Sequence, residues 1–451
     1  MARTTIASVE RGIRSGRLPP KDEPASPRPA IRGVPSARLL NRSTGDRRPI
    51  VHQPFRPFLP AFVVSGPLLR SARCGDRFMS IGAPFLALAF LLSVVAVEIL
   101  RRLSPWLGLV NRPSARKVHT GLVPLCGGVA MFLAFSTIVA LRTGQPSTPL
   151  LADLWLLVVV LGMLVGIGFW DDLRDIGPGK RLAVQTVAAM ALLVGWGAQS
   201  GAPLVIAFDG VAALPGWIAL PVTLLFFVGL TNAFNMIDGL DGLAGGIGAV
   251  ALAGTALAGL VTARPAVADG SLLLLAVVFG FLVFNMRSPW RARASVFMGD
   301  AGSMMLGGAV AGFIVSLSAV DMAAAAPARP PVLFPALLWL VALPVIDTVS
   351  LMVRRPLAGR SPMAADRAHL HHLLVDHGLS PVRATAALVA ISALLGGVGL
   401  TGILLAWSGF WMGVGLAVPV LAHSAFVRFV AYRGRRRLAE PSLAASPEAA
   451  E

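Results

Sequence analysis

Long apolar runs separated by short polar stretches dominate the chain from Met79 onward. Eleven of these runs have lengths of about 16–22 residues, close to the roughly 20 residues that a helix needs to cross the hydrocarbon core of a bilayer. They lie at approximately 82–100, 122–141, 151–169, 183–199, 217–234, 243–262, 271–286, 303–320, 332–352, 384–406 and 409–427. Glycine and proline recur inside them, and membrane-spanning helices tolerate both. The pattern predicts an all-α polytopic membrane protein with about eleven transmembrane helices.

Residues 1–78 form a different region, rich in Pro, Ser and Arg and without a helical period. Such a composition is typical of disordered segments, because it buries too little apolar surface to offset the entropy of ordering. Met79 opens an apolar run directly, so we interpret the region as a basic disordered extension that results from a misassigned start codon. The predicted organisation is an extension over 1–78, a polytopic domain over 79–430 and a cytoplasmic tail over 431–451.

Basic residues are concentrated in alternate loops of this predicted topology, and the opposite loops contain only Arg142, Arg264 and Arg329. Since Lys and Arg accumulate in cytoplasmic loops, the N-terminus is expected outside and the C-terminus in the cytoplasm. Composition agrees with a membrane protein, because 55% of the 451 residues are hydrophobic. The net charge of +17 would suit a nucleic-acid-binding protein. A single Tyr and the lack of a basic stripe interleaved with aromatic residues argue against nucleic acid as a partner.

Three short acidic motifs abut apolar runs on the predicted cytoplasmic side. They are Asp171-Asp172, the segment 232–242 and the segment 297–303. A carboxylate at the bilayer centre costs at least roughly 2.5–3.5 kcal/mol, so ionisable groups at membrane depth are candidates for function. Acids that crowd together need a counter-charge, and Mg²⁺ is the divalent ion that prefers such hard oxygen ligands. Solvated loop acids are the alternative interpretation, but they would not gather on one side.

The adjacent carboxylates of Asp171 and Asp172 repel each other, so a folded site has to supply a metal ion or a lysine to keep both ionised. One carboxylate can then face the metal while its neighbour acts as a base. Taken alone, an Asp-Asp pair is equally typical of a solvated helix end.

The second motif repeats a polar residue every three positions, at Asn232, Asn235, Asp238 and Asp241. On a helix this spacing places all four near one face. The glycines that follow the two aspartates would let the backbone approach a ligand closely. Helix capping by Asn and Asp is the alternative, and it accounts for one or two of the four residues.

In the third motif, Asp300 lies just before the predicted span 303–320. Backbone N–H groups at a helix N-terminus favour phosphate oxygens, and Asp300 could ligate a metal ion that bridges those oxygens. A plain capping role for Asp300 is the alternative.

Histidines cluster in the predicted cytoplasmic loop 353–383, where Arg367 precedes His369-Leu-His371-His372. The alternation predicts an extended, strand-like turn that aims His369 and His371 alike. A zinc site, contacts to phosphate or hydroxyl groups, and a solvated polar run are three interpretations of this cluster. No cysteine joins the histidines, whereas Arg and His suit the oxygens of a diphosphate.

Together, these motifs resemble those of the polyprenyl-phosphate N-acetylhexosamine-1-phosphate transferases, which form glycosyltransferase family 4. The matching pieces occur in the family's order between about Met79 and Arg383. They are Arg116-Lys-x-His119 with Pro124 and Gly127-Gly128, Asp171-Asp172, Asn232-Ala-Phe-Asn235-Met-Ile-Asp238-Gly-Leu-Asp241-Gly-Leu, Phe297-Met-Gly-Asp300-x-Gly-Ser303 and His369-Leu-His371-His372.

The resemblance implies that a sugar-1-phosphate moves from a UDP-linked N-acetylhexosamine to a polyprenyl phosphate, with release of UMP. It implies an active site on the cytoplasmic face of the bacterial inner membrane. The implied cofactor is Mg²⁺, with Mn²⁺ as a substitute, and Asn235 and Asp300 look like metal-site residues supported by Asp238. The implied partners are the UDP-sugar, the polyprenyl phosphate lipid and the membrane itself. A homodimer is kept as a candidate assembly.

The resemblance also implies roles in catalysis and substrate binding. Asp171 resembles the base, or the group that positions the acceptor phosphate, with Asp172 beside it. Lys180 resembles the family lysine that contacts phosphate. The implied substrate-binding residues are Asp241, Asn285 and Phe297 near the uridine, and Arg367, His369, His371 and His372 near the diphosphate or the sugar.

Two features favour the family branch that transfers N-acetylglucosamine-1-phosphate and starts O-antigen, teichoic acid or related glycans. The branch that takes UDP-muramoyl-pentapeptide tends to carry three consecutive histidines and ten spans. This chain has His369-Leu-His371-His372 and eleven predicted spans. A cation or proton transporter is the alternative from another class of protein. A transporter would place its acids near the midplane and often has two repeated halves, and the sequence has neither feature.

Overall fold

The computed structural model describes residues 81–111, 123–143, 151–174, 176–198, 204–206, 215–288, 291–320, 332–361 and 368–439. All of them belong to the compact unit Leu68–Glu451. The predicted extension 1–78 lies outside the described residues, as do the motif Arg116-Lys-x-His119 and Arg367.

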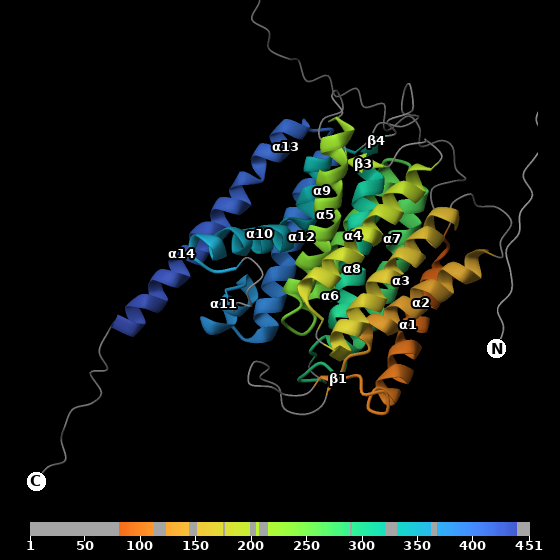
Figure 1. Cartoon of the computed structure of the whole chain (residues 1–451), viewed down its shortest axis with the longest axis horizontal. Coiled ribbons are helices and arrows are strands. Elements are labelled where there is room, and N and C mark those ends of the chain that lie inside the picture. Colours follow the sequence, from red (N-terminus) through yellow and green to blue (C-terminus); the bar gives the residue numbers. More distant parts are fainter. Residues whose placement is uncertain are drawn as a thin grey trace, which may run out of the picture. The chain divides into compact units, whose positions relative to one another are not determined.

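Helices account for nearly all of the described chain (Figure 1). They are α1 (Ala83–Leu103), α2 (Gly127–Thr143), α3 (Leu151–Arg174), α4 (Pro178–Gly197), α5 (Gly216–Ile237), α6 (Leu243–Val261), α7 (Pro265–Asn285), α8 (Gly299–Ser318), α9 (Phe334–Leu338), α10 (Ala342–Leu357), α11 (Leu370–Asp376), α12 (Pro381–Leu404), α13 (Gly409–Gly415) and α14 (Ala417–Ala439). A short 3₁₀ turn, Trp339–Val341, joins α9 to α10.

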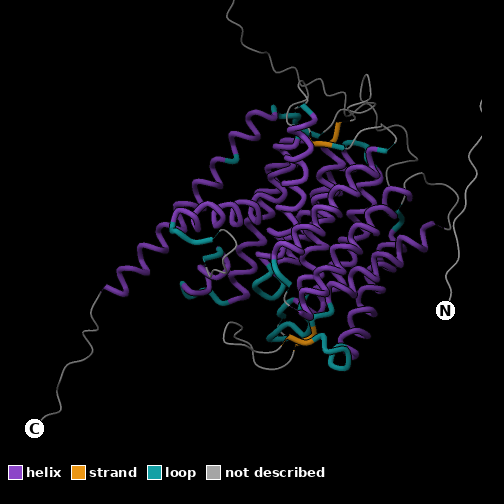
Figure 2. The backbone as a smooth tube through the Cα atoms, viewed as in Figure 1, coloured by secondary structure: helices purple, strands orange, loops and turns teal. Residues whose placement is uncertain are grey.

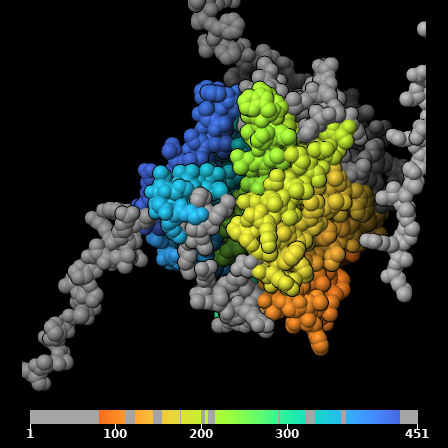
Figure 3. Space-filling view, viewed as in Figure 1, coloured from red at the N-terminus to blue at the C-terminus, as the bar shows by residue number. Residues whose placement is uncertain are grey.

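The predicted all-α polytopic membrane class is confirmed. Each of the eleven predicted segments overlaps a helix or a pair of consecutive helices, although the segment 122–141 begins before α2 does. In the described part of the chain, nine of these stretches are long and apolar enough to cross a membrane, while α2 is apolar but shorter. Large apolar side chains point outward, among them Leu225 of α5 and Val353 of α10, which are 72% and 55% exposed. In a bilayer these side chains would contact lipid, and both helices reach the face drawn in Figure 3.

Two short antiparallel strand pairs mark opposite ends of the helices (Figure 2). At one end β1 (Val110–Asn111) pairs with β2 (Val123–Pro124), and at the other β3 (Val205–Ile206) pairs with β4 (Ala319–Val320). The chain following β2 also binds the segment before α8, because Phe297 N donates to Pro124 O at 2.9 Å and Gly127 N donates to Phe297 O at 3.1 Å. The start of α2 is thereby fixed to the start of α8.

Helix α8 is the centre of the core. In its spanning window 94% of the residues are buried, compared with 17% in α1. It contacts α3, α5, α2 and α6. Glycines of α2 and α3 permit this packing at the start of α8, because a Cβ on Gly128 would lie 2.1 Å from Gly302 N and a Cβ on Gly168 would lie 2.5 Å from Ala301 N. In both cases the obstructing atom belongs to the backbone and cannot rotate away.

Two glycines of α3 offer a matched test of this close packing. We expect Gly168→Ala to destabilise the protein by about 1–3 kcal/mol, since the added methyl group meets the backbone of α8. Gly166→Ala should leave stability unchanged or slightly raised, because no atom lies within 4 Å of the Cβ position there. Thermal unfolding of both variants in detergent measures the difference, and equal midpoints would contradict the contact.

Candidate active site

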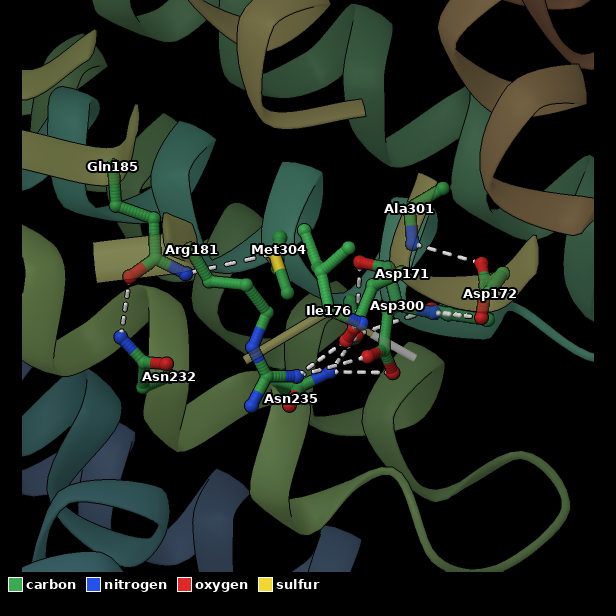
Figure 4. A network of polar contacts seen from close by, with 12 residues as sticks. Asp171, Asp172, Ile176, Arg181, Gln185, Asn232, Asn235, Asp300, Ala301 and Met304 are labelled. Atoms are coloured by element: carbon green, nitrogen blue, oxygen red, sulfur yellow. Dashed lines mark hydrogen bonds and ion pairs between the residues drawn. The ribbon is translucent and has the colours of Figure 1, made fainter. Parts of the chain in front are cut away.

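Four helices bring polar side chains together at the end of the bundle that carries β1 and β2 (Figure 4). Asp171 and Asp172 lie in the last turn of α3, and Arg181 lies in the first turns of α4. Asn235 lies in the last turn of α5, and Asp300 lies in the first turn of α8. Residues more than a hundred positions apart thus converge where their helices end.

Arg181 joins two of the carboxylates. Its Nη1 atom lies 2.5 Å from Asp171 Oδ2 and 3.2 Å from Asp300 Oδ2. The other oxygen of Asp171 accepts a hydrogen bond from Ile176 N at 2.7 Å. One guanidinium group therefore occupies a cation position between two acids from different helices.

Asn235 fixes the orientation of Asp300. Its Nδ2 atom donates to Asp300 Oδ1 at 2.8 Å and lies 3.0 Å from Ser303 Oγ. With Arg181 on one oxygen of Asp300 and Asn235 on the other, the carboxylate is held from both sides.

Asp172 has a separate role, although it adjoins Asp171 in the chain. Its two oxygens accept hydrogen bonds from Asp300 N at 3.0 Å and Ala301 N at 3.2 Å. A carboxylate suits these unpaired N–H groups because it also meets the positive end of the helix dipole. Gly299 has φ +70°, and a Cβ on it would lie 2.5 Å from Asp172 Oδ2. The expectation that the N–H groups at this helix start face a phosphate is wrong for these two groups.

Sequence reasoning missed Arg181 and the buried Gln185 one turn further along α4. Gln185 Oε1 accepts a hydrogen bond from Asn232 Nδ2 at 2.7 Å, which links α4 to α5 beside the acids. The side chain of Lys180, the predicted phosphate contact, is exposed. The four-residue spacing of Arg181 and Gln185, which puts both on one helix face, was the available signal.

The motif 232–242 leaves the helix sooner than predicted. Helix α5 ends at Ile237, and Gly242 has φ +77° before α6 begins. The prediction of four polar residues along one helix face is therefore wrong for Asp241. Its Oδ2 atom accepts hydrogen bonds from Arg287 Nε at 2.7 Å and from Ala294 N at 3.1 Å.

Asn285 is the last residue of α7, and Phe297 lies in the connection between α7 and α8. Asn285 is buried and bridges two loops, because its Oδ1 accepts from Gly242 N at 2.8 Å and its Nδ2 donates to Val296 O at 2.9 Å. The predicted uridine residues Asp241, Asn285 and Phe297 therefore lie on connected loops.

Asp238 follows the last turn of α5. Burial, and then the nearby charges of Asp172 and Asp241, raise the pKa of the Asp238 carboxyl to about 7. Protonation is favoured because a third negative charge at this position lacks a solvent shell.

The histidine segment is a helix, so the prediction of an extended turn is wrong. His369 is the residue before α11, and its Nδ1 atom lies 2.9 Å from Asp347 Oδ2. His371 is buried, and burial, followed by the neighbouring His372 and His369, lowers its pKa to about 3. A Cβ on Gly239 would lie 2.1 Å from His371 Nε2, so this helix packs directly against the Asp238 loop.

The acids at the helix ends fit a magnesium ion by their chemistry. Asp171 and Asp300 supply two carboxylates around one cation position, and Asn235 adds an amide beside them. Among the described residues, no three Asp, Glu, His or Cys side chains form a metal-binding cluster. Mg²⁺ usually takes only one or two carboxylates and completes its shell with water and substrate phosphates, so two acids suffice.

Comparison with known proteins agrees with this arrangement. Residues 154–318, which run from α3 through α8, match the family model described as glycosyl transferase family 4. An undecaprenyl-phosphate alpha-N-acetylglucosaminyl 1-phosphate transferase from Salmonella typhi is 31% identical over 312 residues, covering 69% of this chain and 81% of the relative. The protein of the same name from Escherichia coli strain K12 is 30% identical over the same shares.

Another organism also has a similar protein. A probable undecaprenyl-phosphate N-acetylglucosaminyl 1-phosphate transferase from Bacillus subtilis strain 168 is 31% identical over 309 residues, covering 65% of this chain and 78% of the relative. From the matched helices and from relatives of this identity and coverage, the chain belongs to glycosyl transferase family 4.

Proposed function

We propose that the protein transfers N-acetylglucosamine-1-phosphate from UDP-N-acetylglucosamine to undecaprenyl phosphate, releasing UMP. The names of its relatives support this substrate pair. The observation that carries the proposal is the meeting of Asp171 from α3, Arg181 from α4 and Asp300 from α8 at one cation position. A site of this kind at the end of membrane helices can meet a lipid phosphate and a nucleotide diphosphate together.

In the proposed reaction an oxygen of the lipid phosphate attacks the β-phosphorus of the UDP-sugar. The bond from that phosphorus to the bridging oxygen breaks, and UMP leaves with the bond's electron pair. Arg181 offers planar N–H donors to phosphate oxygens, and Asp171 positions the acceptor phosphate or takes its proton. Direct attack is favoured, because phosphoryl transfer needs positioning and charge stabilisation more than a covalent intermediate.

Asp300 and Asn235 would hold a magnesium ion, and bound Mg²⁺ would offset negative charge on the two phosphates of the donor. The donor itself would extend over the neighbouring loops. Asp241, Asn285 and Phe297 are proposed to contact the uridine. The diphosphate or the sugar is assigned to Arg367, His369, His371 and His372.

The proposed topology has eleven spans, with α2 and α4 crossing in addition to the nine stretches that are long and apolar enough. The N-terminus would then be outside and the C-terminus in the cytoplasm of the bacterial inner membrane. This orientation puts the acidic site on the cytoplasmic side, where a nucleotide sugar is available.

A transfer assay on the purified full chain tests the proposed function. It would contain undecaprenyl phosphate, Mg²⁺ and, in parallel, UDP-N-acetylglucosamine, UDP-N-acetylgalactosamine or UDP-muramoyl-pentapeptide. We expect lipid-dependent UMP release from UDP-N-acetylglucosamine alone, abolished by EDTA and restored by added Mg²⁺ or Mn²⁺. Release from the pentapeptide donor would reassign the substrate, and turnover that survives EDTA would contradict the metal site.

The neighbours Arg181 and Lys180 form a second test. Arg181→Gln should lower kcat/KM about 100-fold or more, since it removes the charge that joins Asp171 to Asp300. Lys180→Gln removes the same charge from the neighbouring, exposed residue, and we expect kcat/KM to fall by less than about tenfold. The assay is the UMP release described above, with gel filtration to verify folding. A larger loss of kcat/KM in Lys180→Gln than in Arg181→Gln would indicate that the lysine makes the phosphate contact.

Asp238 makes stability depend on pH. Its pKa of about 7 in the folded chain exceeds the ordinary value of 3.8, so between those values the folded state alone retains the proton. The contribution of Asp238 to stability therefore falls as pH rises from about 4 to 7 and levels off above that. Asp238→Asn removes this loss. The difference between its unfolding midpoint and that of the native chain, measured in EDTA, should therefore be about 3 °C or more larger at pH 7.5 than at pH 5. Parallel midpoint curves for the two proteins would refute the shifted pKa.

A further inference from the structure

Asp347 of α10 is a buried carboxylate with three hydrogen-bond donors from two other parts of the chain. Its Oδ2 atom lies 2.9 Å from His369 Nδ1. Its Oδ1 atom accepts from Leu370 N at 3.0 Å and lies 3.2 Å from His423 Nε2. Asp347 is 1% exposed, His369 7% and His423 8%, so water has little access to these contacts.

His423 comes from α14, the last helix of the described chain, which packs against α10 and α11 (Figure 1). No residue of the acidic site or of the recognised motifs comes from this helix. Through Asp347 its imidazole is nevertheless joined to His369, the residue before α11.

We infer that His423 is a positioning residue for the active site: through Asp347 it fixes the ring of His369 and the start of α11. The inference rests on the proposed function, in which the histidines of this segment contact the donor. Helix α14 then helps to set the geometry of the site, in addition to its place in the helix bundle.

The tautomer of His369 follows from these contacts. An ionised carboxylate can only accept, so the proton of His369 must lie on Nδ1. The lone pair of Nε2 is then directed away from Asp347, toward whatever the ring faces. Which nitrogen of a histidine acts on a ligand is set by the bond that the other nitrogen makes.

His423 is held in one tautomer by the same reasoning. Its Nε2 donates to Asp347, and its buried Nδ1 has no hydrogen-bond partner among the described residues. The neutral ring with its proton on Nε2 therefore matches this environment. In that form His423 stabilises the oxygen of Asp347 that also receives Leu370 N at the start of α11.

Without His423, Asp347 Oδ1 would keep only the backbone donor of α11. A buried carboxylate that loses a donor costs free energy until it moves or is protonated. Either response disturbs His369, because movement breaks the Nδ1 contact and protonation removes the preference for one tautomer. Loss of His423 should therefore lower kcat, since the acids that would bind the metal are unchanged.

Three variants of the full chain separate positioning from simple helix attachment. His423→Phe keeps a ring of similar size but removes the donor, whereas His423→Gln retains an N–H at nearly the same reach. Trp339→Phe is the control, because it removes a buried hydrogen bond of 2.9 Å from Trp339 Nε1 to Met412 O that also secures the C-terminal helices. Each is measured for kcat, KM and thermal stability in detergent. Nitrogen-15 NMR of the seven histidines reports the tautomer of His369.

We expect His423→Phe to lower kcat about tenfold with little change in KM, and to reduce the population of the Nδ1–H tautomer of His369. His423→Gln should recover most of the rate, and Trp339→Phe should lose stability without losing rate. The inference is overturned if His423→Phe retains kcat within about twofold, or if Trp339→Phe loses as much. Absence of UMP release from the native chain would instead remove the proposed function, and the His369 tautomer in His423→Phe would still decide the inference.

Discussion

The attraction between the Arg181 guanidinium and the carboxylates of Asp171 and Asp300 is the interaction on which the site depends. Two acids from different helices approach one cation, whose positive charge offsets the repulsion between them. The contact requires that α3, α4 and α8 end at the same depth. It also places a positive group where the proposed reaction collects negative phosphate oxygens.

The packing beneath the site makes this approach feasible. Gly128 and Gly168 bring α2 and α3 against the backbone of α8, which no larger residue would allow. Asp172 then binds the N–H groups that α8 leaves unpaired. The same helix turn therefore serves packing, capping and the orientation of Asp300, so stability and chemistry depend on shared atoms.

Much of this could be read from the sequence, since apolar runs give helices directly and acids beside them stand out. The convergence of Asp171, Asn235 and Asp300 was expected because all three motifs were predicted to lie on one side of the membrane. Arg181 was overlooked because Lys180 beside it carries the same charge, and the four-residue spacing from Arg181 to Gln185 was the local sign of which one faces the site. The contact of Asp347 with His423 joins residues 76 positions apart on helices whose pairing the apolar pattern leaves open. The helix at 370–376 was missed because seven residues are too few to show a period.

The seam between α3 and α8 also bears on motion. Asp172 accepts hydrogen bonds from the first N–H groups of α8, and glycines beside it let the two helices pack in close contact. Sliding of α3 past α8 would therefore break several contacts at once. The ends of α3 and α8 therefore form a rigid base for the site. Entry of a bulky lipid and release of a nucleotide would then depend on movement of the surrounding parts: the 238–242 turn, residues 291–298 and α11. The rates of lipid entry and nucleotide release should accordingly be limited by movement of these surrounding parts, while the acids keep one geometry throughout turnover.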